Sequence, residues 1–227
     1  MKPGFHPLIA AASFVQLSFN PNHAPTGARL LGSLSGRTYE RMFDRFVAQG
    51  GLAILNDPVS LASRLSDTDA LEALPADTLG AIYLRWGRRR GYSPPQLMDL
   101  VRESVPMSEK RHSPDELAFY EREIAAHDLW HVVAGYGAEP LGEVCEVHFM
   151  SGVYKNPGFR VICPLTRAFH WKNRVALDEA YRRGRAAAWL PATRWENLLD
   201  RPLTEVRHSL GLGAKPLHYS TREFDWK

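Results

Sequence analysis

The chain has 227 residues, a formal net charge of +3 at pH 7 and 44% hydrophobic residues. This length supports a large hydrophobic core, and the composition excludes disorder as the main state. The small net charge argues against a nucleic-acid-binding protein, which usually carries more positive charge along one face. Two cysteines, Cys145 and Cys163, are too few for a disulfide framework, so we expect small buried side chains in a reducing compartment.

The amino terminus, MKPGFHPLIAAASFVQLSF, faintly imitates a secretory signal because an apolar run follows Lys2. His6, Pro7 and Gln16 interrupt that run, and neither a cleavage site nor an arginine-rich amphipathic pattern follows. No run in the chain reaches the roughly 18 apolar residues of a membrane-spanning helix. The sequence therefore predicts a mature, cytosolic chain.

The elements that follow are predicted to be helices. Capping residues stand just before a proline at four places, a pattern typical of helix starts: Asp57-Pro58, Ser93-Pro94, Ser113-Pro114 and Asp200 with Pro202. Amphipathic periodicity predicts helices over residues 38–48, 77–90, 97–105 and, in one long run, 166–190. Residues 158–165, GFRVICPL, are the best strand candidate. We predict an all-α, single-domain protein over residues 1–227.

Residues 113–134 form the best-specified helix, which we expect to be buried at the centre of the fold. Ser113 and Glu116 make a capping box, and Leu117, Tyr120 and Ile124 form an apolar stripe. His127 and His131 continue this stripe, and Asp128 lies within about 100° of both around the helix axis. Gly135 and Gly137 are expected to end the helix.

The segment HDLWHVVAGYGAEPLGE, residues 127–143, indicates a divalent-metal site. One histidine on an apolar face is usually a core residue, but burying two beside a carboxylate without partners costs several kcal/mol. The ligands and catalytic residues we predict are His127, Asp128, His131 and Glu143. Asp128 replaces the glutamate of the H-E-x-x-H peptidase motif, which argues against a peptidase. This donor set suits zinc, iron or manganese.

Other ionisable residues near the motif are weaker candidates. Glu139 and Glu146 are expected to be solvated or to lie just outside the ligand set, His148 to lie in the core or at the surface, and His112 to be exposed. The chain has neither a glycine-rich phosphate loop nor a G-x-S-x-G motif, which argues against nucleotide-dependent and serine-hydrolase chemistry.

The pattern H-D-x-x-H, eleven residues and E, formed by His127, Asp128, His131 and Glu143, resembles the signature of the coenzyme Q biosynthesis protein 4 family. Residues 56–83 and 182–212 read like the same family, and the resemblance covers about residues 30–217. It implies a role in ubiquinone synthesis: removal of the ring carboxyl at carbon 1 of a polyprenylated hydroxybenzoate, with zinc as the usual metal. If a hydroxyl replaces the carboxyl, iron or manganese fits better, because zinc has no redox chemistry.

The resemblance also implies partners and a location. We expect a polyprenylated aromatic lipid, a membrane surface, other ubiquinone-biosynthesis proteins and a homodimer as partners, and no nucleic acid. Basic clusters at 88–90 and 182–185 would face anionic lipid, and aromatic helix faces such as 81–86 would line a groove for the tail or pack in the core. Without a transit peptide, we expect a bacterial protein that is cytoplasmic and peripheral on the inner membrane.

Two rival functions stay open. The first is a metal phosphohydrolase of the HD type, in which His112 and Asp178 would join the His127–Asp128 pair. This alternative gives no role to His131 or Glu143. The second is a lipid-binding scaffold that organises the ubiquinone-pathway enzymes and in which the metal is structural. A structural zinc site is usually dominated by cysteine and histidine, whereas this donor set is rich in carboxylates.

Overall fold

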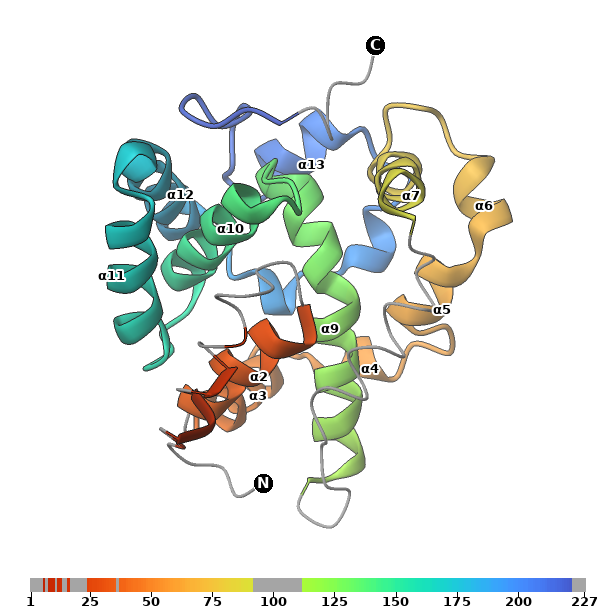
Figure 1. Ribbon diagram of the computed structural model, residues 1–227. Helices are drawn as coiled ribbons and strands as arrows, with labels where there is room; N and C mark the ends of the chain where they lie inside the picture. Colours follow the sequence, from red (N-terminus) through yellow and green to blue (C-terminus); the bar gives the residue numbers. More distant parts are fainter. Residues whose placement is uncertain are drawn as a thin grey trace.

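The computed structural model describes residues 24–35, 37–91 and 112–221, together with residues 6, 8–10, 12, 13 and 16. Within these ranges the chain forms helices and no strand, so the prediction of an all-α protein is confirmed (Figure 1). The predicted helix at 97–105 and the start at Ser93-Pro94 lie outside the described residues. The helices are α2 (Ala24–Leu34), α3 (Thr38–Ala48), α4 (Leu52–Leu55), α5 (Leu61–Ser66), α6 (Thr68–Glu72), α7 (Leu79–Arg90), α9 (Pro114–Ala134), α10 (Pro140–Val153), α11 (Phe159–Phe169), η1 (Trp171–Asn173), α12 (Arg174–Ala186), η2 (Leu190–Ala192), η3 (Trp195–Asn197) and α13 (Leu203–Ser209).

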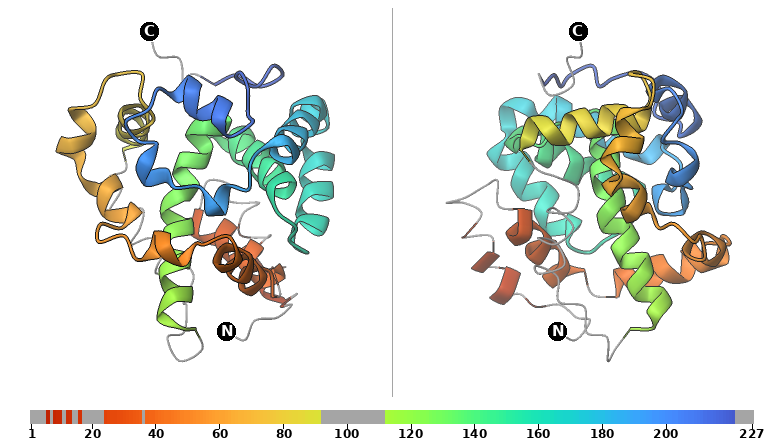
Figure 2. Two further views of the ribbon diagram at one scale, coloured as in Figure 1. Left: turned by 180° about the vertical axis from the view of Figure 1, so that it is seen from behind. Right: turned by 90° about the vertical axis from the view of Figure 1, so that its right-hand side faces the viewer.

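Helix α9 runs through the middle of the molecule, and the other elements pack around it (Figures 1 and 2). The predicted capping box is present: the Ser113 hydroxyl accepts from the Glu116 amide, and the Glu116 carboxylate accepts from the Ser113 amide. The predicted stripe of Leu117, Tyr120 and Ile124 is only half-buried, whereas residues 128–134 are buried all round. The second half of α9, which carries the two histidines, is therefore enclosed by other helices.

Helices α10 and α12 pack with their backbones almost touching. A Cβ atom added to Gly184 would lie 2.0 Å from the Phe149 carbonyl oxygen, and one added to Gly152 would lie 2.4 Å from the Tyr181 carbonyl oxygen. Only glycine permits this approach. It fixes α10, whose first turn carries Glu143, against a second helix.

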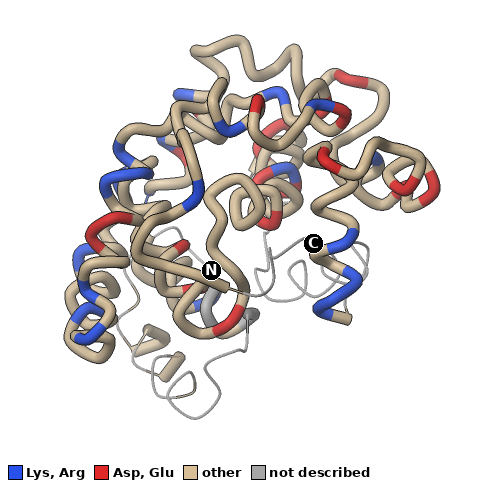
Figure 3. The backbone as a smooth tube through the Cα atoms, turned by 90° about the horizontal axis from the view of Figure 1, so that it is seen from above, with Lys and Arg blue, Asp and Glu red and all other residues tan. Residues whose placement is uncertain are grey.

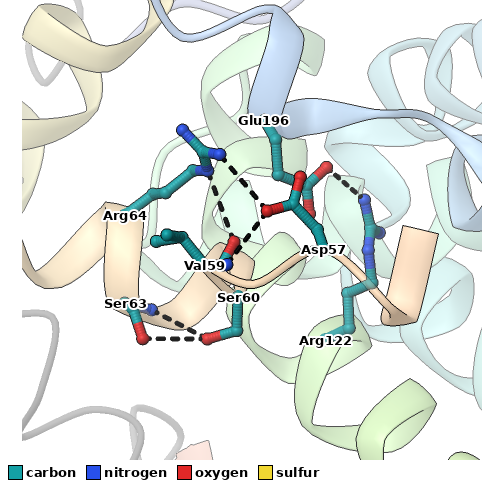
Figure 4. Close-up of polar contacts among 7 residues, drawn as sticks. All are labelled: Asp57, Val59, Ser60, Ser63, Arg64, Arg122 and Glu196. Carbon is teal, nitrogen blue, oxygen red and sulfur yellow. Dashed lines mark hydrogen bonds and ion pairs between the residues drawn. The ribbon is translucent and has the colours of Figure 1, made fainter. Parts of the chain in front are cut away.

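Two of the predicted helix starts differ in detail from the structure. Ser60, and not Asp57, caps α5 by accepting from the Ser63 amide, while Asp57 accepts from the Val59 amide and pairs with Arg64 (Figure 4). At α13, Pro202 stands at the cap position, and no side chain caps that helix. In both places the chain turns just after the proline, so the helix begins later than predicted.

Neither the strand candidate at 158–165 nor the single helix predicted at 166–190 is formed. Residues 159–169 form α11, and η1 separates it from α12. The inward side of α11 explains the helix, because Thr166 donates to the Ile162 carbonyl and contacts His148 of α10, while Ile162 packs against Leu30 and Leu34. Ile162 and Thr166 are four residues apart, which is helical spacing. Their tertiary contacts outweigh the local strand propensity of the segment.

The buried Arg207 and the partly buried Arg183 tie the carboxyl end of α9 to the rest of the fold. Arg207 donates to the carbonyls of Val132 and Val133, and Arg183 donates to the carbonyl of Ala134. Near the middle of α9, Arg122 forms an ion pair of 2.9 Å with Glu196, and both side chains are 5% exposed (Figure 4). Arg183 is thus a structural residue and not a free member of the basic cluster at 182–185.

None of the helices in the described part of the chain is both long and apolar enough to cross a membrane.

Candidate metal centre

The turn between α9 and α10 brings the predicted residues together. Gly135 adopts the left-handed conformation, with a φ of 80°, and ends α9 as predicted, whereas Gly137 does not adopt that conformation. Gly137 instead donates its amide to the Tyr219 hydroxyl at 2.7 Å. The same hydroxyl donates to the carboxylate of Glu139, the residue that precedes α10. These contacts hold the turn so that the first turn of α10 faces the last turn of α9.

His131 is the most enclosed of the predicted ligands, with a side chain 1% exposed. Its Nδ1 atom lies 2.9 Å from the Tyr136 carbonyl oxygen, which can only accept, so Nδ1 carries the proton. The Nε2 atom then has a free lone pair, and it is buried without a hydrogen-bond partner among the described residues. Burial lowers the pKa of His131 well below its usual value, and the charges of His127 and Arg90 act in the same direction. The ring is therefore a neutral imidazole, the form that binds metals.

The other three predicted residues form a row with His131. Glu143 Oε2 lies 3.7 Å from His131 Nε2, the two histidine rings are 4.8 Å apart, and His127 Nδ1 lies 3.8 Å from Asp128 Oδ1. The side chain of His127 is 40% exposed and that of Asp128 10%, so the row opens to solvent at His127. Partial burial works to lower the pKa of His127, but Asp128, Glu143 and Glu146 outweigh it and the pKa is raised.

Helix α7 covers the site with residues that the sequence motif does not contain. The Trp86 ring stacks on His131, with ring centroids 5.6 Å apart, and the guanidinium of Arg90 lies 4.6 Å above Trp86. Burial raises the pKa of Tyr83, and the charge of Asp128 raises it further. Residues 79–84 and Trp86 are buried, so this aromatic stretch belongs to the core and covers the candidate site.

Of the two expectations for Glu146, solvated or just outside the ligand set, the first is wrong, because Glu146 is completely buried. Neither of its carboxylate oxygens has a hydrogen-bond partner among the described residues. Burial raises its pKa to about 8; the charge of His127 opposes this shift and the charge of Glu143 adds to it. Its spacing of three residues from Glu143 places both on one face of α10, which is the sequence signal that could have identified it.

The remaining candidates lie away from the row. His148 is buried and contacts the Thr166 hydroxyl, and Cys145 is buried as predicted, while Cys163 is only half-buried. His112 is largely covered, against expectation, because it lies beside Glu116 and against the Tyr120 ring. It stands fifteen residues before His127, about 22 Å along α9. Asp178, on α12, pairs with Arg167. The residues of the HD-type alternative are therefore not brought together.

The family model described as coenzyme Q (ubiquinone) biosynthesis protein Coq4 matches residues 6–216. This chain belongs to the Coq4 family. Membership assigns it to ubiquinone biosynthesis, as the resemblance implied, and the match includes the whole His127–Glu143 motif.

Similar proteins agree with this membership. A mitochondrial ubiquinone biosynthesis protein COQ4 of Paracoccidioides lutzii is 28% identical over 233 residues, covering 94% of this chain and 77% of the relative. The COQ4 protein of Clavispora lusitaniae is 30% identical over 173 residues, covering 73% of this chain and 51% of the relative. A crystal structure of a candidate ubiquinone biosynthesis protein from Nostoc punctiforme, 19% identical, superposes with a TM-score of 0.61 over 92% of this chain and all of that one. The crystal structure supports the fold.

The expected location at the cytoplasmic membrane of a bacterium is contradicted by these comparisons. The curated Coq4 relatives from Paracoccidioides lutzii, Clavispora lusitaniae and Botryotinia fuckeliana are fungal proteins named as mitochondrial. The earlier inference rested on the composition of the first residues, which does not determine location.

The donor atoms of the row fit the metal that the Coq4 family implies. His131 presents an unpartnered Nε2 lone pair, and two ligands bonded at about 2.1 Å to one tetrahedral metal lie roughly 3.4 Å apart, close to the 3.7 Å between His131 and Glu143. As the side chains stand, the described residues include no group of three or more histidine, cysteine or acidic side chains at ligating distance. The His131–Glu143 pair is therefore the part of the site already at that spacing, and His127 and Asp128 extend it.

Proposed function

We propose that this Coq4 family member is a metal-dependent enzyme that removes the ring carboxyl at carbon 1 of a polyprenylated hydroxybenzoate. The observation that carries the proposal is the buried, unpartnered Nε2 atom of His131 facing Glu143 at 3.7 Å. Leaving such an atom without a partner costs free energy, which a ligand that accepts its lone pair offsets. The set that would hold a divalent ion is His127, Asp128, His131 and Glu143.

A bound zinc ion would supply Lewis acidity toward the substrate carboxylate and ring oxygens, and iron or manganese would supply redox chemistry as well. The protein's own residues orient the donors. The Tyr136 carbonyl fixes the tautomer of His131, and Trp86 covers one face of its ring and excludes water there. The exposed edge of His127 leaves one side of the row open to substrate.

The overall chemistry decides which metal is needed. Loss of carbon dioxide leaves an electron pair on ring carbon 1, and a proton taken up at that carbon completes a simple decarboxylation. Replacement of the carboxyl by a hydroxyl also requires an oxidant such as dioxygen, and then iron or manganese is the fitting ion, because zinc cannot carry electrons. The polyprenyl tail is strongly apolar, so the enzyme meets its substrate at a membrane surface and beside other ubiquinone-pathway proteins.

The test combines metal content with turnover. Protein purified without added metal is analysed for its elements, and carbon dioxide release from a short-tailed prenylated hydroxybenzoate is measured under air and under nitrogen. We expect bound metal and turnover in the parent chain, and loss of both in His131→Ala. The exposed His208→Ala is the matched control.

A protein that keeps its metal and its fold but releases no carbon dioxide would favour the scaffold alternative. Equal turnover by the parent chain and by His131→Ala would contradict the proposed site.

A further inference from the structure

Helix α11 and the turn after it expose large apolar side chains that a water-soluble surface does not need. Val161 is 42% exposed, Leu165 39% and Phe169 71%, while Trp171 in η1 is 62% and Val175 at the start of α12 is 47% exposed. We call these five residues the apolar face. Scattered exposed apolar residues are common, but neighbouring ones in a single stretch mark an interaction site.

The geometry of α11 separates this face from the core. Three side chains of α11 point inward. Phe159 packs in the core, Ile162 packs against Leu30 and Leu34, and Thr166 contacts His148. On a helix that advances about 100° per residue, Val161 and Leu165 lie on the side away from Phe159, and Phe169, in the last turn, follows the side of Ile162 but is exposed. Figures 1 and 2 show α11 at the edge of the molecule, with α10 and α12 behind it. At this edge the five side chains of the apolar face are open to solvent.

Positive charge surrounds the apolar face. Between Glu146 and Asp178 the sequence has no acidic residue and five basic ones, which are Lys155, Arg160, Arg167, Lys172 and Arg174. In Figure 3 the helices on the left, α11 and α12, carry mostly blue segments. The two acidic residues of these helices are both engaged: Asp178 is paired with Arg167, and the buried Glu179 accepts hydrogen bonds from the Leu217 and His218 amides.

A wide cavity of about 1270 Å³ opens between α3, α11 and α12, next to the apolar face. Arg41, Lys155, Arg160 and Arg185 line it, and among its described lining residues Asp178 is the only acid. An excess of cations around a concave surface favours an anionic partner.

We propose that the apolar face inserts into the surface of an anionic lipid bilayer, with the surrounding cations and the basic cavity at the level of the phosphate head groups. Aromatic and aliphatic side chains flanked by lysine and arginine are the pattern of a helix that lies in the membrane interface. At about 17 Å, α11 is too short to cross a bilayer, so it lies in the surface.

A second copy of the chain fits this surface less well than a membrane does. A symmetric dimer through the apolar face would bring the same cations of both copies together, and no free carboxylate of this stretch would offset them. The basic residues 88–90 on α7 lie across the molecule from α11 and cannot reach the same bilayer plane (Figures 1 and 2). Two of them have partners within the fold, since Arg88 pairs with Glu72 and Arg90 lies over Trp86.

The first experiment measures co-sedimentation of the full chain with vesicles of phosphatidylcholine, with and without 30% phosphatidylglycerol, at about 0.05 and 0.5 M salt. We expect binding to the anionic vesicles that weakens with salt. Leu165→Ser combined with Phe169→Ser should reduce it at least ~10-fold, because both lose apolar contact with lipid. The matched control, Val59→Ser with Leu217→Ser, changes two equally exposed apolar residues elsewhere and should bind like the parent.

The second experiment tests the charges. Lys172→Glu with Arg174→Glu should weaken binding by at least ~20-fold, since each cation near an anionic surface contributes about five-fold. Lys215→Glu with Arg194→Glu, two exposed cations outside the stretch, should have a much smaller effect. Replacing residues 88–90 with glutamine should leave binding unchanged.

Trp171 gives a direct readout of insertion. Lipids brominated in their acyl chains should quench its fluorescence, and Trp171→Phe should remove most of the quenching while the protein still binds. Equal quenching in Trp171→Phe, or equal vesicle binding by the Leu165/Phe169 variant, would overturn the proposal. So would a dimer that this variant dissociates, or an absence of vesicle binding by the parent chain.

The proposed function supplies only the reason why this protein would meet a membrane. The vesicle experiments use no substrate and no metal, and circular dichroism checks the fold of each variant. Their failure would therefore leave the decarboxylase proposal standing, and a catalytically inactive chain could still bind vesicles.

Discussion

The imidazole of His131 is fixed on three sides: the Tyr136 carbonyl holds Nδ1, the Trp86 ring covers one face, and Nε2 points toward Glu143. A ring with only one free atom has only one direction in which to bind a ligand. Glu143 is the residue that supplies the other half of that site, and it comes from a different helix. The pair is therefore more informative than either residue alone.

Replacing Glu143 with alanine tests this pair. We expect the helical content to be retained, because Glu143 lies in the first turn of α10 and is partly exposed. Metal affinity should fall, and carbon dioxide release should fall by at least ~100-fold, the scale of losing a group that stabilises a transition state. Elemental analysis, circular dichroism and the turnover assay measure the three effects.

The matched control is Glu205→Ala, which also removes a glutamate from the first turn of a helix, and it should change neither metal content nor turnover. Unchanged metal content and turnover in Glu143→Ala would show that Glu143 is not a ligand.

A second residue-scale prediction concerns Glu123 on α9. Burial raises the pKa of this carboxyl from 4.5 to about 8, although Arg122 opposes the shift, and its Oε1 atom has no hydrogen-bond partner among the described residues. The folded state therefore holds this proton more tightly than the unfolded state. Its contribution to stability is complete below about pH 4.5 and is lost as the pH rises toward 8.

Glu123→Gln should accordingly flatten the fall in the free energy of unfolding between pH 5 and 8, by an amount on the order of a few kcal/mol at most. Urea unfolding of the metal-free chain across this pH range measures it. Glu121→Gln, an exposed neighbour, should follow the parent curve. An identical pH dependence for Glu123→Gln and the parent would contradict the assignment.

At the scale of elements, α10 and α12 pack at a distance that only glycine permits. Gly184→Ala would place a Cβ atom 2.0 Å from the Phe149 carbonyl oxygen, and a backbone atom cannot rotate away as a side chain can. We expect a loss of at least ~2–3 kcal/mol of stability, the upper range of overpacking costs. Thermal and urea unfolding measure it.

Gly32→Ala is the control for the same change in a helix. Its Cβ would meet no atom of the described residues within 4 Å, so relief of the helical glycine penalty should stabilise the chain by a few tenths to about 1 kcal/mol. Equal effects of the two substitutions would show that the two helices do not pack as closely as described.

The elements also show what a sequence can predict. The predicted bounds of α3 agree with the structure, and the Ser113 capping box identified the start of α9, because both signals depend on residues within one helix. Residues 158–165 were the best strand candidate because Val161 and Ile162 favour a strand locally and Gly158 and Pro164 bound the segment. The contacts of Ile162 and Thr166 with α2 and α10, which no local pattern contains, stabilise the helix.

At the scale of the whole molecule, the candidate site also combines residues that local spacing predicts with residues that only tertiary packing brings together. His127, Asp128 and His131 share a helix face, so their spacing alone predicted that they lie together. Glu143 followed from the turn and from the family resemblance. Trp86, which covers His131, could not be predicted, because it lies 45 residues earlier in the chain and reaches the site only through the packing of α7 on α9.

The contact between Gly137 and Tyr219 has a consequence for how the site opens. The Gly137 amide is held by a phenol 82 residues away, so it can exchange with solvent only when the C-terminal segment lifts from the turn. Its hydrogen–deuterium exchange rate therefore reports that local opening. Tyr219→Phe, which removes the acceptor, should speed exchange at Gly137 by on the order of 10- to 100-fold, whereas Tyr181→Phe should not. Tyr219 thus sets how often the turn that carries Glu143 toward His131 is free to move.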